Sequence, residues 1–362
     1  MTVAVFGASG LVGEAAVRAF AASGASVVAV SRRPPAAVAG ATVEHLPVDL
    51  AAASAARAAL RGRTDITHVV FAAVHEMPDL VRGWRDREQM AINLELLRNA
   101  LTPVIEAGSL EHVSLLQGTK AYGVHLHPIR VPSKESEPRD PHENFYWLQE
   151  DWVREQSGAA GFAWTIFRPP LIVGPNWGVA MNLVPVIGAY AALRSAEGLP
   201  FSYPGGPSYV AEAVDTAVLA DALVWAASAP AARDQHFNIS NGDVFQWRDL
   251  WPGLAGQLGV ELGDDEMLRI SRYLLDRADL WDDITRAHGL QPIRLSELLG
   301  RSHLYADFQF AAGASAPPPP ALLSTIKLRE AGFHGVRDTE ATFREAFRTL
   351  QERRVLPLAE DL

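Results

Sequence analysis

The feature that most constrains this fold is an apolar N-terminal stretch that runs through three evenly spaced glycines into a helical pattern. The apolar run Val3–Phe6 predicts a strand, and an Ala- and Val-rich helical spacing follows the last glycine. Gly7 allows a tight exit from the strand, Gly10 lets the backbone approach a pyrophosphate, and Gly13 lets the helix pack against the sheet. The stretch therefore predicts a strand, a phosphate-binding turn and a helix.

The turn itself is expected to bind a dinucleotide. Free backbone N–H groups at a helix start attract anions, and the helix dipole adds to this attraction. The turn residues expected to contact the cofactor are Gly7, Ser9, Gly10, Leu11, Val12 and Gly13. An ordinary glycine-rich turn is the alternative, but the flanking strand and helix provide the context that dinucleotide binding requires. The Gly-x-x-Gly-x-x-Gly spacing resembles that of the short-chain dehydrogenase/reductase superfamily.

The end of the second predicted strand, Ser26–Val30, indicates which dinucleotide binds. In such folds the residue closing this strand lies beside the adenosine ribose, where an acid favours NAD and arginine accommodates the 2′-phosphate of NADP. Here Ser31, Arg32 and Arg33 follow the strand and no acid is present. We therefore expect these three residues to bind NADP(H). The alternative is a solvated charge pair at a strand end.

Further cofactor contacts are expected after the next strands, since ligands bind outside the carboxyl ends of parallel strands. Asp49 and Leu50 stand where this superfamily commonly contacts adenine, although Asp49 could equally cap the following helix. Ala72 and Ala73 end the fourth predicted strand, and Gln117 follows the fifth. We expect all five residues to line the cofactor.

Lys120 stands out through composition. Only three of the 32 basic residues are lysines, namely Lys120, Lys134 and Lys327. An ammonium group is compact enough to fit beside a nicotinamide ribose and can tune a neighbouring pKa, whereas guanidinium is bulky and permanently charged. Because Lys120 follows the fifth strand, we interpret it as an active-site residue; a surface lysine is the alternative.

A second candidate, Tyr146, begins the next helix. In most reductases of the superfamily a lysine follows the tyrosine by four residues, but here Glu150 occupies that position. The segments Asn144–Tyr146 and Gly118–Tyr122 resemble the progesterone 5β-reductase/iridoid synthase-like family, an atypical extended branch of the superfamily. In that family the catalytic tyrosine belongs to an Asn-Phe-Tyr motif and the lysine comes from the loop after the fifth strand. The resemblance implies that Tyr146 and Lys120 are catalytic and also contact the cofactor.

The resemblance continues downstream. The segment Trp164–Gly174 resembles the family's sixth strand and nicotinamide-side turn, which implies that Pro169 and Ile172 contact the cofactor. The match runs to about residue 260 and returns from 332 to 357. Trp147 departs from the tyrosine usual in plant members, and residues 263–320 are not placed residue by residue against the family.

The family reduces activated carbon–carbon double bonds of enones and enals with NADPH. The resemblance therefore implies a small hydrophobic carbonyl substrate, with Tyr146 donating a hydrogen bond to its oxygen and Lys120 holding the nicotinamide ribose. Carbonyl reduction or alcohol oxidation on the same scaffold is the first alternative, and a non-catalytic NADP-binding sensor is the second. Sugar-nucleotide epimerisation is disfavoured because the usual lysine is missing and the arginine pair disfavours NAD.

Composition excludes several other classes of protein. The net charge of −10 and the absence of long basic runs argue against nucleic acid and membrane partners. No cysteine and no metal-ligand spacing are present, so we expect no disulfide and no metal site. The sequence shows no signal peptide and no long apolar run, from which we expect a cytoplasmic protein. A homodimer is compatible with the sequence.

The predicted fold is α/β, a Rossmann doubly wound parallel sheet with a smaller, mostly helical C-terminal substrate cap. Residues 1–175 and 206–245 are expected to form the NADP-binding domain, and residues 176–205 and 246–362 the substrate-binding cap. Aromatic residues of the cap, such as Trp281 and Phe310, are expected either to form its core or to line the substrate pocket.

Overall fold

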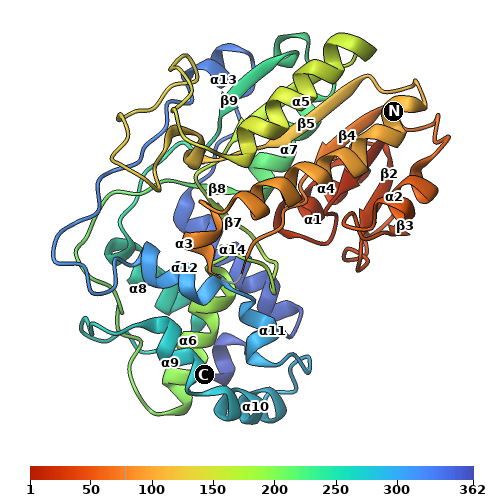
Figure 1. Cartoon of the computed structure of the whole chain (residues 1–362). Coiled ribbons are helices and arrows are strands. Elements are labelled where there is room, and N and C mark those ends of the chain that lie inside the picture. The colour runs from red at the N-terminus through yellow and green to blue at the C-terminus, as the bar shows by residue number, and fades with distance from the viewer. Residues whose placement is uncertain (78) are drawn as a thin grey trace. The chain divides into compact units, whose positions relative to one another are not determined.

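The computed structural model describes residues 1–77 and 79–362, which form two compact units (Figure 1). The first unit comprises Met1–Pro170, Thr216–Ser240 and Leu323–Gly335; the second comprises Leu171–Asp215, Asn241–Leu322 and Val336–Leu362. The sequence prediction assigned Leu323–Gly335 to the cap. This segment belongs to the first unit because Leu323 pairs with Ser133 in a parallel bridge and the Ser324 N–H donates to the Ser133 carbonyl. The roles of the two units in binding cofactor and substrate stay predictions.

The first unit is built on a seven-stranded sheet in the order β3-β2-β1-β4-β5-β6-β9, and every neighbouring pair is parallel. The strands are β1 (Thr2–Phe6), β2 (Ser26–Ser31), β3 (Val43–Pro47), β4 (His68–Phe71), β5 (His112–Leu116), β6 (Ala163–Arg168) and β9 (Gln235–Asn238). Strand order reverses between β1 and β4, which creates the switch point where such sheets bind ligands. The predicted doubly wound parallel sheet is confirmed.

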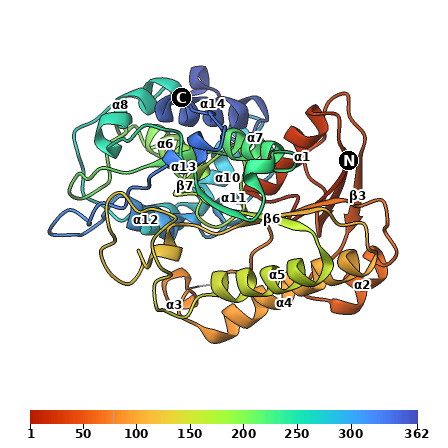
Figure 2. The same cartoon turned by 90° about the horizontal axis from the view of Figure 1, so that it is seen from above.

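Helices cover both faces of this sheet (Figure 2). One face carries α1 (Leu11–Ala22) and α7 (Thr216–Ala226), and the other carries α2 (Ala53–Leu60), α4 (Arg87–Glu106) and α5 (Phe145–Ala160). Since both faces are covered, the central strands read as continuous apolar runs, and the residues from Val3 to Phe6 are fully buried. The unit also contains α3 (Leu80–Gly83), η1 (Thr119–Tyr122), η2 (Pro230–Ala232) and α13 (Ile326–Glu330).

The second unit is mostly helical. It contains the parallel pair β7 (Leu171–Val173) and β8 (Ala213–Asp215) with α6 (Val184–Ala196), α8 (Trp247–Leu258), α9 (Ile270–Leu275), α10 (Ala278–Ala287), α11 (Leu295–Leu299), α12 (Ser302–Gln309), α14 (Thr339–Glu352) and η3 (Ala359–Asp361). Its core combines aliphatic side chains with a group of aromatic rings, among which Phe201 stacks on Trp251 with ring centroids 4.5 Å apart. Trp281 and Phe310 belong to this core, as one of the two interpretations predicted. Among the residues that the structure describes, no helix combines the length and apolar character needed to cross a membrane.

Candidate active site

The glycine turn is packed so closely that side chains are excluded from it. Gly7 has a left-handed φ of +78°, and a methyl group there would lie 2.8 Å from the backbone of Ala72 and Ala73. A methyl group on Gly13 would lie 2.1 Å from the Gly7 carbonyl oxygen. The N-cap of α1 is Gly10, which has no side chain to cap the helix. The backbone N–H groups of the first turn are therefore directed outward from the helix start, as an anion-binding turn requires.

The turn after β2 presents two arginines. The Ser31 hydroxyl donates to the Arg33 carbonyl at 2.5 Å and curls this turn. Arg32 and Arg33 are both exposed, and within residues 1–77 and 79–362 neither forms a salt bridge. Unpaired guanidinium groups at the end of β2 suit the 2′-phosphate of NADP.

The remaining predicted cofactor residues are distributed over several strand ends. Asp49 is exposed, and its Oδ1 accepts from the Ala51 N–H at 3.0 Å, which is a local turn contact. Leu50 is buried in the hydrophobic core of the first unit, together with residues of the sheet such as Phe6 and Val28. Ala72 and Ala73 lie against Gly7, so the structure brings the ends of β1 and β4 together. Ile172 lies in β7 of the second unit, whereas the other predicted residues belong to the first.

Asn144 links the segments that carry the two predicted catalytic residues. As the N-cap of α5, its Oδ1 accepts from the Tyr146 N–H at 3.0 Å. Its Nδ2 donates to the Lys120 carbonyl at 3.3 Å. The Tyr146 hydroxyl reaches the loop after β5, because a methyl group on Gly118 would lie 3.3 Å from it and 3.4 Å from the Pro169 carbonyl oxygen. The phenol is therefore at the carboxyl ends of β5 and β6, where reductases of this fold act.

A tryptophan that sequence reasoning missed contacts both candidates. The Lys120 Nζ lies 3.9 Å from the ring centroid of Trp84, and the Tyr146 ring lies 5.3 Å from it in an edge-to-face arrangement. Phe145 packs against both aromatic rings, at 4.9 Å from Trp84 and 4.7 Å from Tyr146. The only sequence signal for Trp84 is an aromatic residue shortly before a helix, and that pattern is too common to mark a site.

The surroundings of Lys120 lower the pKa of its ammonium group. Burial lowers the pKa of Lys120 to about 8, while the carboxylate of Glu76 acts in the opposite direction. With this pKa the side chain stays mostly protonated at neutral pH. Lys120 therefore places a positive charge on the Trp84 ring, which Tyr146 also contacts.

Glu150, which replaces the usual lysine, is the centre of a buried charge network. Its Oε1 lies 2.7 Å from Arg139 Nη2 and 2.9 Å from His236 Nε2, and its Oε2 accepts from Gln117 Nε2 at 2.9 Å. Arg168 Nη2 lies 3.9 Å from Oε2. Burial raises the pKa of Glu150, but contacts with His236, Arg139 and Gln117 outweigh it and hold the pKa well below its usual range. The carboxylate thus ties α5 to β5, β6 and β9.

The side chain of Gln117 is engaged in this network. Its Oε1 accepts from Arg168 Nε at 2.9 Å, and its Nε2 donates to Glu150 and, at 3.4 Å, to the Tyr146 carbonyl. Its backbone N–H donates to the Phe167 carbonyl. The predicted cofactor contact of Gln117 stays a prediction. In the structure its side chain instead fixes α5 against the sheet.

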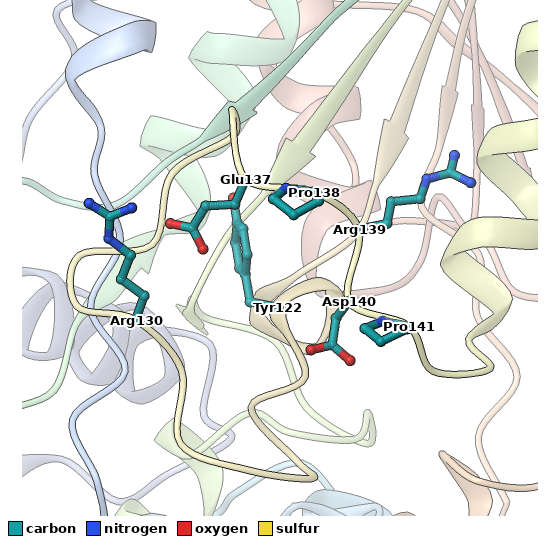
Figure 3. A pocket seen from close by; sticks show the side chains of 7 residues that line it. All are labelled: Tyr122, Arg130, Glu137, Pro138, Arg139, Asp140 and Pro141. Carbon is teal, nitrogen blue, oxygen red and sulfur yellow. The ribbon is translucent and has the colours of Figure 1, made fainter.

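A hollow of about 310 Å³ lies beside this network (Figure 3). Its lining consists of Tyr122, Arg130, Glu137, Pro138, Arg139, Asp140 and Pro141. Arg139 already binds Glu150, and Asp140 already contacts His127 and His142. The hollow contains neither predicted catalytic residue, so we do not assign the reaction to it.

Known proteins of one family match this chain over most of its length. Residues 49–357 match the model of a family described as "PRISE-like Rossmann-fold domain". The (S)-8-oxocitronellyl enol synthase of Antirrhinum majus is 32% identical over 347 residues, covering 91% of this chain and 85% of that protein. The protein of the same name from Catharanthus roseus is 30% identical over 347 residues, covering 91% and 84%.

Solved structures show the same fold at lower identity. UDP-glucose 4-epimerase of Thermus thermophilus, in complex with NAD, superposes with a TM-score of 0.63 at 18% identity, covering 96% of this chain and 99% of that one. A short-chain dehydrogenase/reductase superfamily protein of Agrobacterium tumefaciens with bound NAD gives a TM-score of 0.63 at 15% identity, covering 98% of each chain. These likenesses confirm the predicted Rossmann fold.

Proposed function

Because this chain belongs to the PRISE-like Rossmann-fold family, we propose that it reduces activated carbon–carbon double bonds of small hydrophobic enones or enals with NADPH. The family match and the relatives confirm the prediction of an enzyme of the short-chain dehydrogenase/reductase type. The observation that carries the proposal is the convergence of Lys120 and Tyr146 on the Trp84 ring, with the Tyr146 hydroxyl at the carboxyl ends of β5 and β6.

The choice of NADPH rests on residues after β1 and β2. The turn around Gly10 has the form that holds a pyrophosphate, and exposed Arg32 and Arg33 suit a 2′-phosphate. When bound, NADPH supplies the hydride. The predicted cytoplasmic location and the homodimer remain predictions that this proposal does not need.

Tyr146 would act on the carbonyl oxygen of the substrate. Reduction of the β-carbon leaves negative charge on that oxygen, and a hydroxyl already held in place stabilises the charge without reorganisation. The rings of Trp84 and Phe145 hold the phenol, and Asn144 caps the helix on which it stands. Tyr146 is thus a preorganised donor.

Lys120 would support Tyr146 electrostatically. Its ammonium group is mostly protonated at neutral pH because its pKa is about 8. A positive charge near the phenol stabilises negative charge on neighbouring groups, including the enolate oxygen of the substrate. The compact ammonium can also donate to a ribose hydroxyl, which guanidinium would be too bulky to do.

The experiment is NADPH consumption with small enones, enals and simple ketones, followed by product analysis. We expect a saturated carbonyl product and a loss of about 10²- to 10³-fold in kcat for Tyr146→Phe. Tyr122→Phe is the control, because its buried hydroxyl donates to Asn238 and is not directed at Gly118. It should lower stability more than turnover. An alcohol product would instead establish carbonyl reduction, and tight NADPH binding without turnover would establish a sensor.

A further inference from the structure

We propose that Trp84 is a positioning residue that holds both catalytic side chains, Lys120 over the face of its indole and Tyr146 against its edge. The inference rests on the proposed function, since it assumes that these two side chains serve the reduction. Trp84 itself contacts neither the reacting atoms nor the cofactor in this proposal. It acts through the two residues that do.

The three side chains come from separate parts of the chain. Trp84 lies between α3 and α4, Lys120 lies in η1, and Tyr146 lies in the first turn of α5. The indole is only 5% exposed. Phe145 packs against it at 4.9 Å, and the His125 ring meets it edge-on at 6.2 Å. Because these rings enclose the indole, it has little freedom to swing away from Lys120.

An indole is suited to hold an ammonium group. Its face carries partial negative charge, tryptophan is the strongest of the aromatic residues in cation–π contacts, and the attraction grows when the cation is desolvated. A lysine side chain has a flexible four-carbon stem, so a ring under the ammonium fixes a position that the stem alone cannot. The edge-to-face contact with Tyr146 adds a preferred ring geometry. One rigid group therefore sets the positions of both catalytic side chains.

Besides the indole, two titratable groups interact electrostatically with Lys120. Glu76, from the segment after β4, favours the protonated amine, and its Oε2 accepts from Gln89 Nε2 at 3.2 Å. His125, from the loop after η1, has a pKa lowered to about 4, mainly by burial, and is neutral at pH 7. A carboxylate and an indole face thus oppose the cost of burying the Lys120 ammonium group. Removing the indole should make protonation of Lys120 less favourable.

The test is the series Trp84, Trp84→Phe and Trp84→Leu. Within the described residues the indole N–H makes no hydrogen bond, so Trp84→Phe removes none and changes only the ring. We expect kcat to fall along the series, by about 10- to 100-fold for Trp84→Leu, as a displaced catalytic group would produce. The Kd of NADPH, measured by fluorescence, should change less than kcat does, because the glycine turn and the Arg32 and Arg33 side chains are left intact. Trp225→Phe is the control, because that indole packs on Phe237 and Phe333 instead.

A second readout does not depend on activity. The chain has three lysines, so acylation rates of each amine can be followed against pH by peptide mass spectrometry, with exposed Lys134 as the internal reference. Loss of the indole face should lower the pKa of Lys120 by about 0.5–1 unit in Trp84→Leu and by less in Trp84→Phe. An unchanged titration would overturn the proposal. A rise would also overturn it, because the ring would then only exclude water.

The two proposals fail in different ways. If wild-type protein leaves every enone and ketone unreacted, the proposed function is wrong, whereas the Lys120 titration still tests the contact with Trp84. If wild-type protein reduces enones and the Trp84→Leu protein matches it in kcat, the positioning role is wrong. Circular dichroism melting of each variant checks folding, and Trp84→Phe keeps the test decisive if Trp84→Leu does not fold.

Discussion

Glu150→Lys restores the tyrosine–lysine spacing of most short-chain reductases, and the structure predicts that it will abolish folding rather than improve catalysis. The carboxylate is buried between Arg139, Arg168 and His236 and accepts from Gln117. Removing one partner of a buried ion pair costs about 3–5 kcal/mol. An ammonium group there would add repulsion of roughly 4 kcal/mol for each guanidinium about 4 Å away, at an effective dielectric constant near 20. The sum is comparable with the whole stability of a domain, about 5–15 kcal/mol.

The neutral variant Glu150→Gln separates loss of charge from repulsion. It should fold but melt roughly 10 °C lower, since each kcal/mol shifts the melting temperature by about 2–4 °C in a unit of this size. Asp151→Asn is the matched control, because Asp151 binds the same Arg139 at 2.7 Å but its side chain is 63% exposed. A surface pair contributes about 0–1 kcal/mol, so this variant should melt close to wild type. Urea and thermal unfolding measure all three variants. A soluble Glu150→Lys protein with wild-type stability would refute the reasoning.

Three further predictions concern other residues of the first unit. Gly118→Ala should reduce kcat about tenfold with little change in melting temperature, because the new methyl group would lie 3.3 Å from the Tyr146 hydroxyl and displace that hydroxyl. A variant with wild-type kinetics would contradict this position of the hydroxyl. The double change of Arg32 and Arg33 to Ala should weaken NADPH binding far more than NADH binding, as measured by fluorescence titration; equal losses would contradict a 2′-phosphate site. Burial lowers the pKa of His112 to about 3. Below pH 6.5 the imidazole therefore binds a proton in the unfolded chain but not in the folded one. The free energy of unfolding should consequently fall by several kcal/mol between pH 6.5 and pH 4. Urea unfolding across pH should show this loss, and His112→Gln should reduce it.

The sheet could be predicted from sequence because the patterns that form its strands and turns are local in the chain. Apolar runs such as Val3–Phe6 read as strands, and the Gly7–Gly13 spacing appears in the structure as a turn that no side chain could enter. The candidate catalytic pair was predicted by resemblance, and Lys120 also by the scarcity of lysine; the structure places both side chains on one tryptophan. Trp84 lies 36 positions before Lys120 and 62 before Tyr146 in the numbering of the chain. Such contacts arise from tertiary packing, which no spacing rule describes.

The network around Glu150 could not be predicted for the same reason. Its partners Gln117 and His236 stand 33 and 86 positions away in the numbering of the chain. The sequence alone shows Glu150 only as the residue that stands where a lysine is usual, and it predicts a cofactor contact for Gln117. The structure shows that the two side chains bind each other, which connects the departure from the usual motif to the way α5 is held.

The two departures from the common reductase pattern, Glu150 and Lys120, are compatible with each other in the proposed mechanism. A helix held to β6 and β9 by a carboxylate at position 150 cannot carry an ammonium group there, because Arg168 and Arg139 would repel it. In the proposed mechanism the positive charge that assists Tyr146 must then come from another element, and the candidate in this chain is Lys120 in η1. The face of Trp84 supports the amine at that place. The proposed role of Lys120 therefore combines two features of this chain, a carboxylate at position 150 and an aromatic face beneath the amine.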